Sequence, residues 1–342
     1  MSPADRDVPP GLPVICTVAI STCNSAEFFR CCLEQLLSQS LRQSFEVIVI
    51  DSGSDQDESA ICAQYAARFA SFTCVRTPRE TLYSAWNRAL ALAQGRYFIN
   101  ANTDDSLHPD ALQLLVAAME AHPESALAYG DWLWATVPNA PFPWDTAFRR
   151  CVHPEYHPSL PLFYAYAGCH QFWRTDRLRE LGGFNASYTA AGDYDALCRM
   201  ALTRWHAVYV SEAISAFYQN PNGLSRSSET SHREFLEIRD RFRSQVAIHD
   251  LYDVDPTDGV ACASLWVDLG NRALSLHVPW AERAVPDTEF AAICARRALA
   301  LDASNRSAEQ LLVASGHRPP DFLSRLRRII ARDRSSSARV NA

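Results

Sequence analysis

Clustered carboxylates are the chemically most suggestive feature of this 342-residue sequence. Asp104 and Asp105 are adjacent, and Asp193 and Asp195 stand together at the expected start of a helix. Adjacent carboxylates repel each other unless a positive charge lies beside them, and a hard divalent cation bound to a pyrophosphate supplies that charge. The sequence therefore indicates a cation-assisted site for a phosphorylated ligand. Each acid is also typical of a simple helix cap, so this alternative stays open.

Two further polar segments follow predicted strands. Asp51 ends the strongest strand pattern and precedes Ser52-Gly53-Ser54, whose small side chains allow a backbone to approach a ligand closely. Residues 21–24 follow the first strand and contain no glycine, so a G-x-G-x-x-G dinucleotide site is absent there and a dehydrogenase is disfavoured. Ligands of open α/β sheets bind outside the carboxyl ends of the strands, which is where all these polar groups fall.

The elements that must position these groups alternate between strand and helix through the first 135 residues. Near-continuous apolar strands in such an alternation predict an α/β fold with a mostly parallel sheet that is covered on both faces. The predicted strands are residues 14–20, 45–50, 72–76, 97–100 and 127–134, and the predicted helices are 26–41, 58–69, 82–93 and 109–120. A segment rich in proline and aromatic residues, 135–161, follows and resembles a substrate-covering loop. Mixed patterns resume at 168–217, and 229–249 predicts one long charged helix.

Composition excludes several classes of protein. All basic residues are arginine, because the sequence has no lysine, and the formal net charge is −7. A P-loop lysine and a lysine Schiff base are therefore impossible, and a general nucleic-acid binder is disfavoured. The 11 cysteines include no C-x-x-C pair, which indicates reduced, mostly buried thiols in a cytoplasmic protein. No secretory or membrane-spanning pattern is evident, so we expect a soluble or peripheral protein.

Past Asp258 the sequence predicts helices only. The pair 290–301 and 307–315 resembles part of a tetratricopeptide unit, and the arginine-rich pattern 322–334 could contact an anionic membrane surface peripherally. The expected organisation is a flexible N-terminus at 1–12, an α/β domain at 13–250 that divides at 134/135, a helical extension at 258–332 and a disordered tail at 333–342.

Taken together, the motifs resemble those of the family 2 glycosyltransferases, which are inverting enzymes of the GT-A fold. The likeness runs over residues 12–229, and it rests on the order and spacing of weak motifs. These are I-S-T-C-N at 20–24, V-I-V-I-D-S-G-S at 47–54, S-A-W-N-R-A at 84–89, N-T-D-D at 102–105, H-Q-F-W-R at 170–174 and L-G-G-F-N at 181–185. Two positions depart from the family pattern: Asn102 replaces the first acid of D-x-D-D, and Gly192 replaces the Glu that precedes Asp193.

The resemblance implies a GT-A fold and a role for each matching residue. Asp193 would be the catalytic base. A nucleotide-sugar donor would be bound by Thr22, Asn24, Asp51, Ser54, Asn87, Asn102 and Asp104. The acceptor side would hold His170, Trp173 and Asp195, and a divalent metal, Mg²⁺ or Mn²⁺, would be bound by Asp104 and Asp105.

The implied activity is transfer of a sugar, UDP-linked by the family's bias, to a saccharide, lipid-linked or protein hydroxyl with inversion. Bacterial surface polysaccharide or glycoconjugate synthesis, on the cytoplasmic side or at the inner face of the membrane, is the expected setting. Two alternatives stay open. One is a catalytically degenerate GT-A scaffold with a helical adaptor, which the losses at Asn102 and Gly192 favour. The other is a nucleotidyltransferase, which the lack of lysine disfavours.

Overall fold

The computed structural model describes residues 13–144, 149–224, 228–278 and 284–317. Two compact units are present, and the boundary between them lies between Val246 and Ala247. The predicted flexible N-terminus, the arginine-rich tail and the disordered C-terminus lie outside the described residues.

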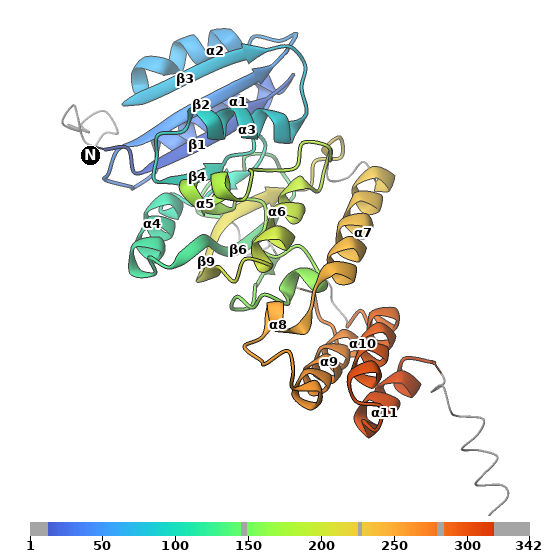
Figure 1. Ribbon diagram of the computed structural model, residues 1–342. Coiled ribbons are helices and arrows are strands. Elements are labelled where there is room, and N and C mark those ends of the chain that lie inside the picture. Colours follow the sequence, from blue (N-terminus) through green and yellow to red (C-terminus); the bar gives the residue numbers. More distant parts are fainter. Residues whose placement is uncertain (1–12, 145–148, 225–227, 279–283, 318–342) are drawn as a thin grey trace, which may run out of the picture. The chain divides into compact units, whose positions relative to one another are not determined.

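A parallel sheet forms the first part of the larger unit (Figure 1). Its strands run in the order β3-β2-β1-β4, and the register pairs Thr22 with Asp51 so that both strand ends meet at one edge. The strands are β1 (Cys16–Thr22), β2 (Phe45–Ser52), β3 (Ser71–Thr77) and β4 (Tyr97–Asn100), and the intervening helices are α1 (Ala26–Leu37), α2 (Glu58–Tyr65, continued by the turn Ala66–Arg68) and α3 (Leu82–Leu92). All of the elements predicted for this region are present within a few residues of their expected bounds.

The sheet continues into a mixed half. β8 pairs antiparallel with both β4 and β6, β6 is parallel to β9, and the short β5 and β7 join at β9 and β6. The strands are β5 (Ser106–Leu107), β6 (Ser125–Ala135), β7 (Arg150–Cys151), β8 (Phe172–Arg174) and β9 (His206–Tyr218), and the helices are α4 (Ala111–Ala121), η3 (Leu160–Leu162), α5 (Thr175–Glu180), α6 (Gly192–Ala201) and α7 (Ser228–Gln245). The predicted loop 135–161 contains β7 and η3 among its described residues.

Helices cover both faces of the parallel strands. Val18 and Val47 point into a core that they share with α1, α2 and α4, whereas the alternate residues Ala19 and Ile48 are equally buried toward α3. Strands that are buried on both faces read as continuous apolar runs, which is why the sequence predicted them well. Because the faces are filled, polar chemistry is left to the loops at the strand ends.

The smaller unit is helical, as predicted. It contains α8 (Ile248–Leu251), α9 (Gly259–Leu274), α10 (Thr288–Leu301) and α11 (Arg306–Ala314). α9 packs on α10, and α10 packs on α11. Gly270 permits the close packing, since a Cβ there would lie 3.1 Å from the Cβ of Cys294. The two predicted helices at 290–301 and 307–315 are both confirmed.

The cysteines and the helices bear on two expectations from composition. All 11 cysteines lie in described residues, none is in a disulfide, and seven are buried. Among the helices of the described residues, none combines the length and the apolar character needed to cross a membrane.

Candidate active site

A pocket of about 500 Å³ opens at the carboxyl ends of β1, β2, β3 and β4. Loops from both halves of the sheet line it, so the site is assembled from distant parts of the chain. The first half contributes Ser21, Cys23, Ser25, Ser52, Arg79, Glu80, Thr81, Leu82 and the segment 102–105, and the second contributes Thr189, Phe217, Tyr218, Asn220, Asn222, Gly223 and Leu224. Arg79 supplies a positive charge to this lining, and three carboxylates supply negative charge.

Asp104 and Asp105 both line the pocket, but their surroundings differ. Asp105 is buried, and its two oxygens accept hydrogen bonds at 2.8 Å from Asn102 Nδ2 and from the backbone N–H of Tyr218. Burial and the neighbouring Asp104 raise the pKa of Asp105 to about 7. Asp104 is partly exposed, and only its Oδ2 has a hydrogen bond among the described residues, from Asn220 Nδ2 at 2.8 Å. Asp104 is therefore the carboxylate that remains open to a ligand.

The donor set suits a hard divalent cation at Asp104. The Asp104 carboxylate and the side-chain amide oxygens of Asn102 and Asn220, which also line the pocket, are ligands that Mg²⁺ and Mn²⁺ accept. Asp105 itself is already engaged by the protein. Its role near a cation would be to hold Asn102 and the backbone at the end of β9.

Asp105 also belongs to a buried mixed cluster with Cys169 and His170, whose potential ligand atoms lie within 4.8 Å of one another. The Cys169 Sγ lies 3.1 Å from His170 Nδ1 and 3.7 Å from Ser215 Oγ. Burial lowers the pKa of His170 to about 3 and raises the pKa of Cys169 well above its usual range. Of these three residues only Asp105 lines the pocket, so Cys169 and His170 pack against it from outside the lining.

Asp193 stands in the first turn of α6, partly exposed, with one oxygen anchored. Its Oδ1 accepts hydrogen bonds at 2.9 Å from the Tyr83 hydroxyl and from the backbone N–H of Tyr194. Burial raises the pKa of Asp193, and these two bonds oppose that rise. Asp193 is not part of the pocket lining, but it is connected to two segments that are. Tyr83 directly follows Leu82 of the lining, and Thr189 of the lining lies in the loop before α6.

Comparison with known proteins agrees with this geometry. The family model Glycosyl transferase family 2 matches residues 17–173. We call the larger unit, which contains this match, the family 2 domain. A PGL/p-HBAD biosynthesis glycosyltransferase of Mycobacterium tuberculosis is 26% identical over 225 residues, which are 65% of this chain and 82% of that protein. An uncharacterized glycosyltransferase of Escherichia coli, YibD, is 26% identical over 130 residues, or 36% of this chain and 38% of that protein.

The solved structures give the fold. Staphylococcus aureus TarS 1–349, crystallised with UDP-GlcNAc, superposes with a TM-score of 0.57 at 16% identity and covers 88% of this chain and 89% of its own. A crystal structure of the same protein with UDP gives a TM-score of 0.56. The family 2 domain therefore has the GT-A fold, and the mixed α/β sheet with C-terminal helices is confirmed.

The family 2 domain compensates for its departure at Gly192. A Cβ at this position would lie 2.7 Å from Tyr83 Cδ2 and 2.8 Å from the Asn185 carbonyl oxygen. Tyr83 therefore fills the space that a side chain at 192 would need, and its hydroxyl bonds to Asp193 instead. The other departure, Asn102, bonds to Asp105, so it also holds a neighbouring acid in place.

Several predicted donor residues lie at the ends of β1 and β2 but are not part of the pocket lining. Asp51 is fully buried; it accepts bonds from the Ser54 N–H and from Arg76 Nη1, both at 2.9 Å. Asn24, with φ of 53°, ties the two loops together because its N–H donates to Ser54 Oγ at 3.1 Å. Thr22 Oγ1 lies 2.8 Å from Ser25 Oγ, and Ser25 does line the pocket.

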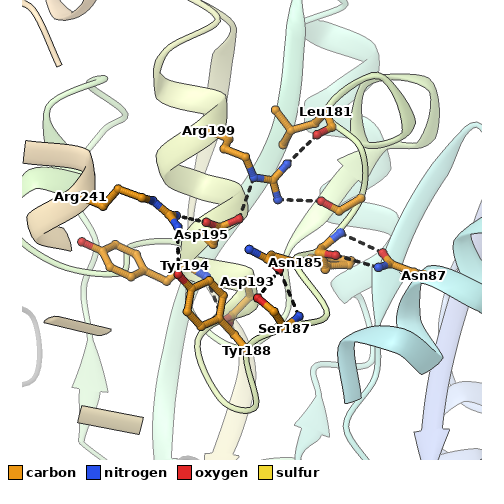
Figure 2. Close-up of polar contacts among 12 residues, drawn as sticks. Asn87, Leu181, Asn185, Ser187, Tyr188, Asp193, Tyr194, Asp195, Arg199 and Arg241 are labelled. Carbon is orange, nitrogen blue, oxygen red and sulfur yellow. Dashed lines mark hydrogen bonds and ion pairs between the residues drawn. The ribbon is translucent and has the colours of Figure 1, made fainter. Parts of the chain in front are cut away.

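Asn87 and the predicted acceptor residues hold the second half of the domain together. Asn87 binds Phe184 through both its amide atoms, at 2.7 and 2.8 Å (Figure 2). Trp173 is fully buried in β8, and its Nε1 donates to Gln171 Oε1 at 3.1 Å. Asp195 is buried between Arg199 and Arg241, and Figure 2 shows its carboxylate held from both sides. The structure thus brings Asn102, Asp104 and Asp105 into the pocket lining and Asp193 beside it, and it gives Trp173, Asp195 and His170 buried positions.

Four contributors were not predicted from the sequence: Arg79 and Thr189 in the lining, Asn220 on Asp104, and Glu234 on the loop before α6. Asn220 contacts Asp104 from 116 residues further along the chain. The other three also had no motif around them, because their partners are distant in the sequence.

Proposed function

We propose that the family 2 domain transfers a sugar from a nucleotide-diphosphate sugar to an acceptor hydroxyl with inversion. One observation carries the proposal. An acid-lined pocket lies at the strand ends, and near it the Asp193 carboxylate accepts hydrogen bonds from described residues through Oδ1 alone. The alternative, a catalytically degenerate scaffold, rested on the departures at Gly192 and Asn102. Tyr83 occupies the space beside Gly192 and bonds to Asp193, and Asn102 bonds to Asp105, so both acids are still held in place.

The donor would occupy the pocket with its pyrophosphate near Asp104. A divalent ion held by Asp104 would neutralise the diphosphate and stabilise it as a leaving group. Arg79 adds positive charge to the lining, and Asn102 and Asn220 orient the acids on either side. A uridine donor is consistent with TarS, a protein of the same fold that was crystallised with UDP-GlcNAc.

Asp193 would act as the general base. The acceptor oxygen forms the new bond to the anomeric carbon from the face opposite the diphosphate, the bond from that carbon to the phosphate oxygen breaks, and Asp193 takes the hydroxyl proton. Its hydrogen bonds end on Oδ1, which leaves Oδ2 for the proton. Burial raises the pKa of this carboxyl and so strengthens it as a base.

The acceptor is proposed to be a hydroxyl of a saccharide, lipid-linked or protein substrate in bacterial surface polysaccharide or glycoconjugate synthesis. The mycobacterial relative is a PGL/p-HBAD biosynthesis glycosyltransferase, which agrees with a glycoconjugate product. The proposal includes a cytoplasmic location and a peripheral membrane contact through residues 322–334. It also assigns donor binding to residues 13–134 and acceptor binding to residues 135–250.

The test is the Asp193→Asn variant. We expect turnover to fall by roughly 10²–10⁴-fold while donor affinity stays within about threefold, because only the proton acceptor is lost. Asp176→Asn is the matched control, since Asp176 is also a first-turn acid and its side chain is 63% exposed. The wild-type product should have the inverted anomeric configuration by NMR. Retention, or a nearly active Asp193→Asn, would overturn the mechanism.

A further inference from the structure

The loop that leads into α6 is held by a carboxylate from α7. Glu234 is 6% exposed, and its Oε1 accepts a hydrogen bond from the Thr189 N–H at 2.8 Å. Its Oε2 accepts bonds from the Ala190 and Ala191 N–H groups at 2.8 and 3.2 Å. One buried side chain therefore fixes three consecutive backbone N–H groups immediately before the helix that carries Asp193.

The local sequence explains why a distant acid is needed. Ala191 is the N-cap residue of α6, and it has no side-chain oxygen to cap the helix. Consecutive N–H groups at a helix N-terminus concentrate partial positive charge, which an anion stabilises. Glu234 supplies that anion from α7, so the geometry of the loop depends on a contact that spans the second half of the domain.

Other side chains of α7 hold the same segment on either side of Asp193. The Tyr188 hydroxyl donates to Glu237 Oε1 at 3.1 Å and accepts from Arg241 Nη1 at 2.9 Å. Arg241 also pairs with Asp195, two residues after Asp193 (Figure 2). The segment from Tyr188 to Asp195 is thus attached to α7 at its start, middle and end.

We propose that Glu234 is a positioning residue for Asp193. It fixes the direction in which α6 begins, and hence where Asp193 Oδ2 lies relative to a hydroxyl entering beside the pocket. Thr189, which Glu234 also holds, lines that pocket, so the same carboxylate sets the spacing between donor and base. This inference rests on the proposed role of Asp193.

Glu234→Gln is the informative variant. The amide has nearly the same size as the carboxylate, but it replaces one acceptor oxygen by an NH₂ donor that faces backbone donors. We expect turnover to fall by about 10- to 100-fold while donor Kd changes by less than about threefold, because a displaced base slows chemistry more than binding. Asp240→Asn is the matched control: it removes the same charge from α7, and Asp240 is 66% exposed beside Arg239.

A double-mutant cycle with Asp193→Asn tests how Glu234 acts. If Glu234 works through Asp193, Glu234→Gln should change the residual rate of Asp193→Asn by less than about threefold. Turnover is expressed per donor-binding site by calorimetry, so a partly unfolded variant does not imitate a loss of chemistry. Full additivity of the two losses, or wild-type turnover in Glu234→Gln, would overturn the inference. A nearly active Asp193→Asn alone would instead overturn the proposed function.

Discussion

The two sides of the pocket are built differently. On the donor side, the polar groups lie in loops at adjacent strand ends. Asp105 bonds to Asn102 of the same loop, and Asn220, which follows β9, bonds to Asp104. On the acceptor side, Asp193 is held by Tyr83, which is 110 residues away, and its loop is held by Glu234. The ends of neighbouring strands place the donor groups together at one edge of the sheet, whereas Asp193 lies on a helix and is positioned by contacts from α3 and α7. Variants should therefore affect the two sides in different ways.

Tyr83→Phe tests the acceptor side most selectively, because it removes only the hydroxyl that bonds to Asp193. We expect turnover to fall by about tenfold, because Asp193 loses one of the two hydrogen bonds that orient it. The Tyr83 bond lowers the pKa of Asp193, so its loss raises that pKa and moves the acidic limb of the kcat/KM profile to higher pH.

A second tyrosine provides the control for this variant. Tyr65 on α2 is also buried and donates to Glu34 at 2.6 Å, on the donor side of the domain and outside the pocket lining. Tyr65→Phe should leave the pH profile unchanged. An acidic limb that stays in place for Tyr83→Phe, or that moves equally for both variants, would show that Tyr83 does not tune Asp193.

A smaller effect is expected for stability against acid. His153 is buried, its Nε2 accepts from Trp132 Nε1 at 3.0 Å, and burial lowers its pKa to about 4. As pH falls from about 6.5 to about 4, the unfolded chain binds a proton that folded His153 does not, so the free energy of unfolding decreases. Once the pH is below about 4, the loss of unfolding free energy from His153 amounts to about 3 kcal/mol.

His153→Gln keeps an acceptor for Trp132 and removes this titration. Its unfolding free energy, measured by urea denaturation, should depend less on pH between 6.5 and 4 than that of the wild type. Near pH 7 the unfolding free energies of the two proteins should change with pH to a similar extent. An identical slope for both proteins across this interval would show that His153 does not contribute to acid sensitivity.

The donor side was predictable for a physical reason. Strands buried on both faces produce long apolar runs, and ligand-binding polar residues follow their ends. Asp104 and Asp105 were therefore expected at this edge of the sheet from position, and the family motif added Asn102. Asp51 and Ser54 were also located correctly at a strand end, but the structure adds that Arg76 engages Asp51 from β3. No local pattern announces such a partner.

The acceptor side was predictable only through resemblance. From the sequence, Gly192 was interpreted as the loss of a glutamate, because no residue near it in the chain reveals that Tyr83 fills the same space. Trp173 and Asp195 looked like acceptor residues from their motifs, yet they are buried by contacts with β8 neighbours and with two arginines. Residues that act across the fold can be recognised only once packing is known.

The central claim is that the pocket at the strand ends binds a nucleotide sugar through a divalent ion at Asp104. Calorimetric titration of UDP-sugars with Mn²⁺ and with EDTA tests it most directly. We predict binding that requires the ion and that weakens by about 100-fold or more in Asp104→Ala. Asp110→Ala, whose side chain is 54% exposed, should bind as the wild type does. Full donor affinity in EDTA, or unchanged affinity in Asp104→Ala, would contradict the account.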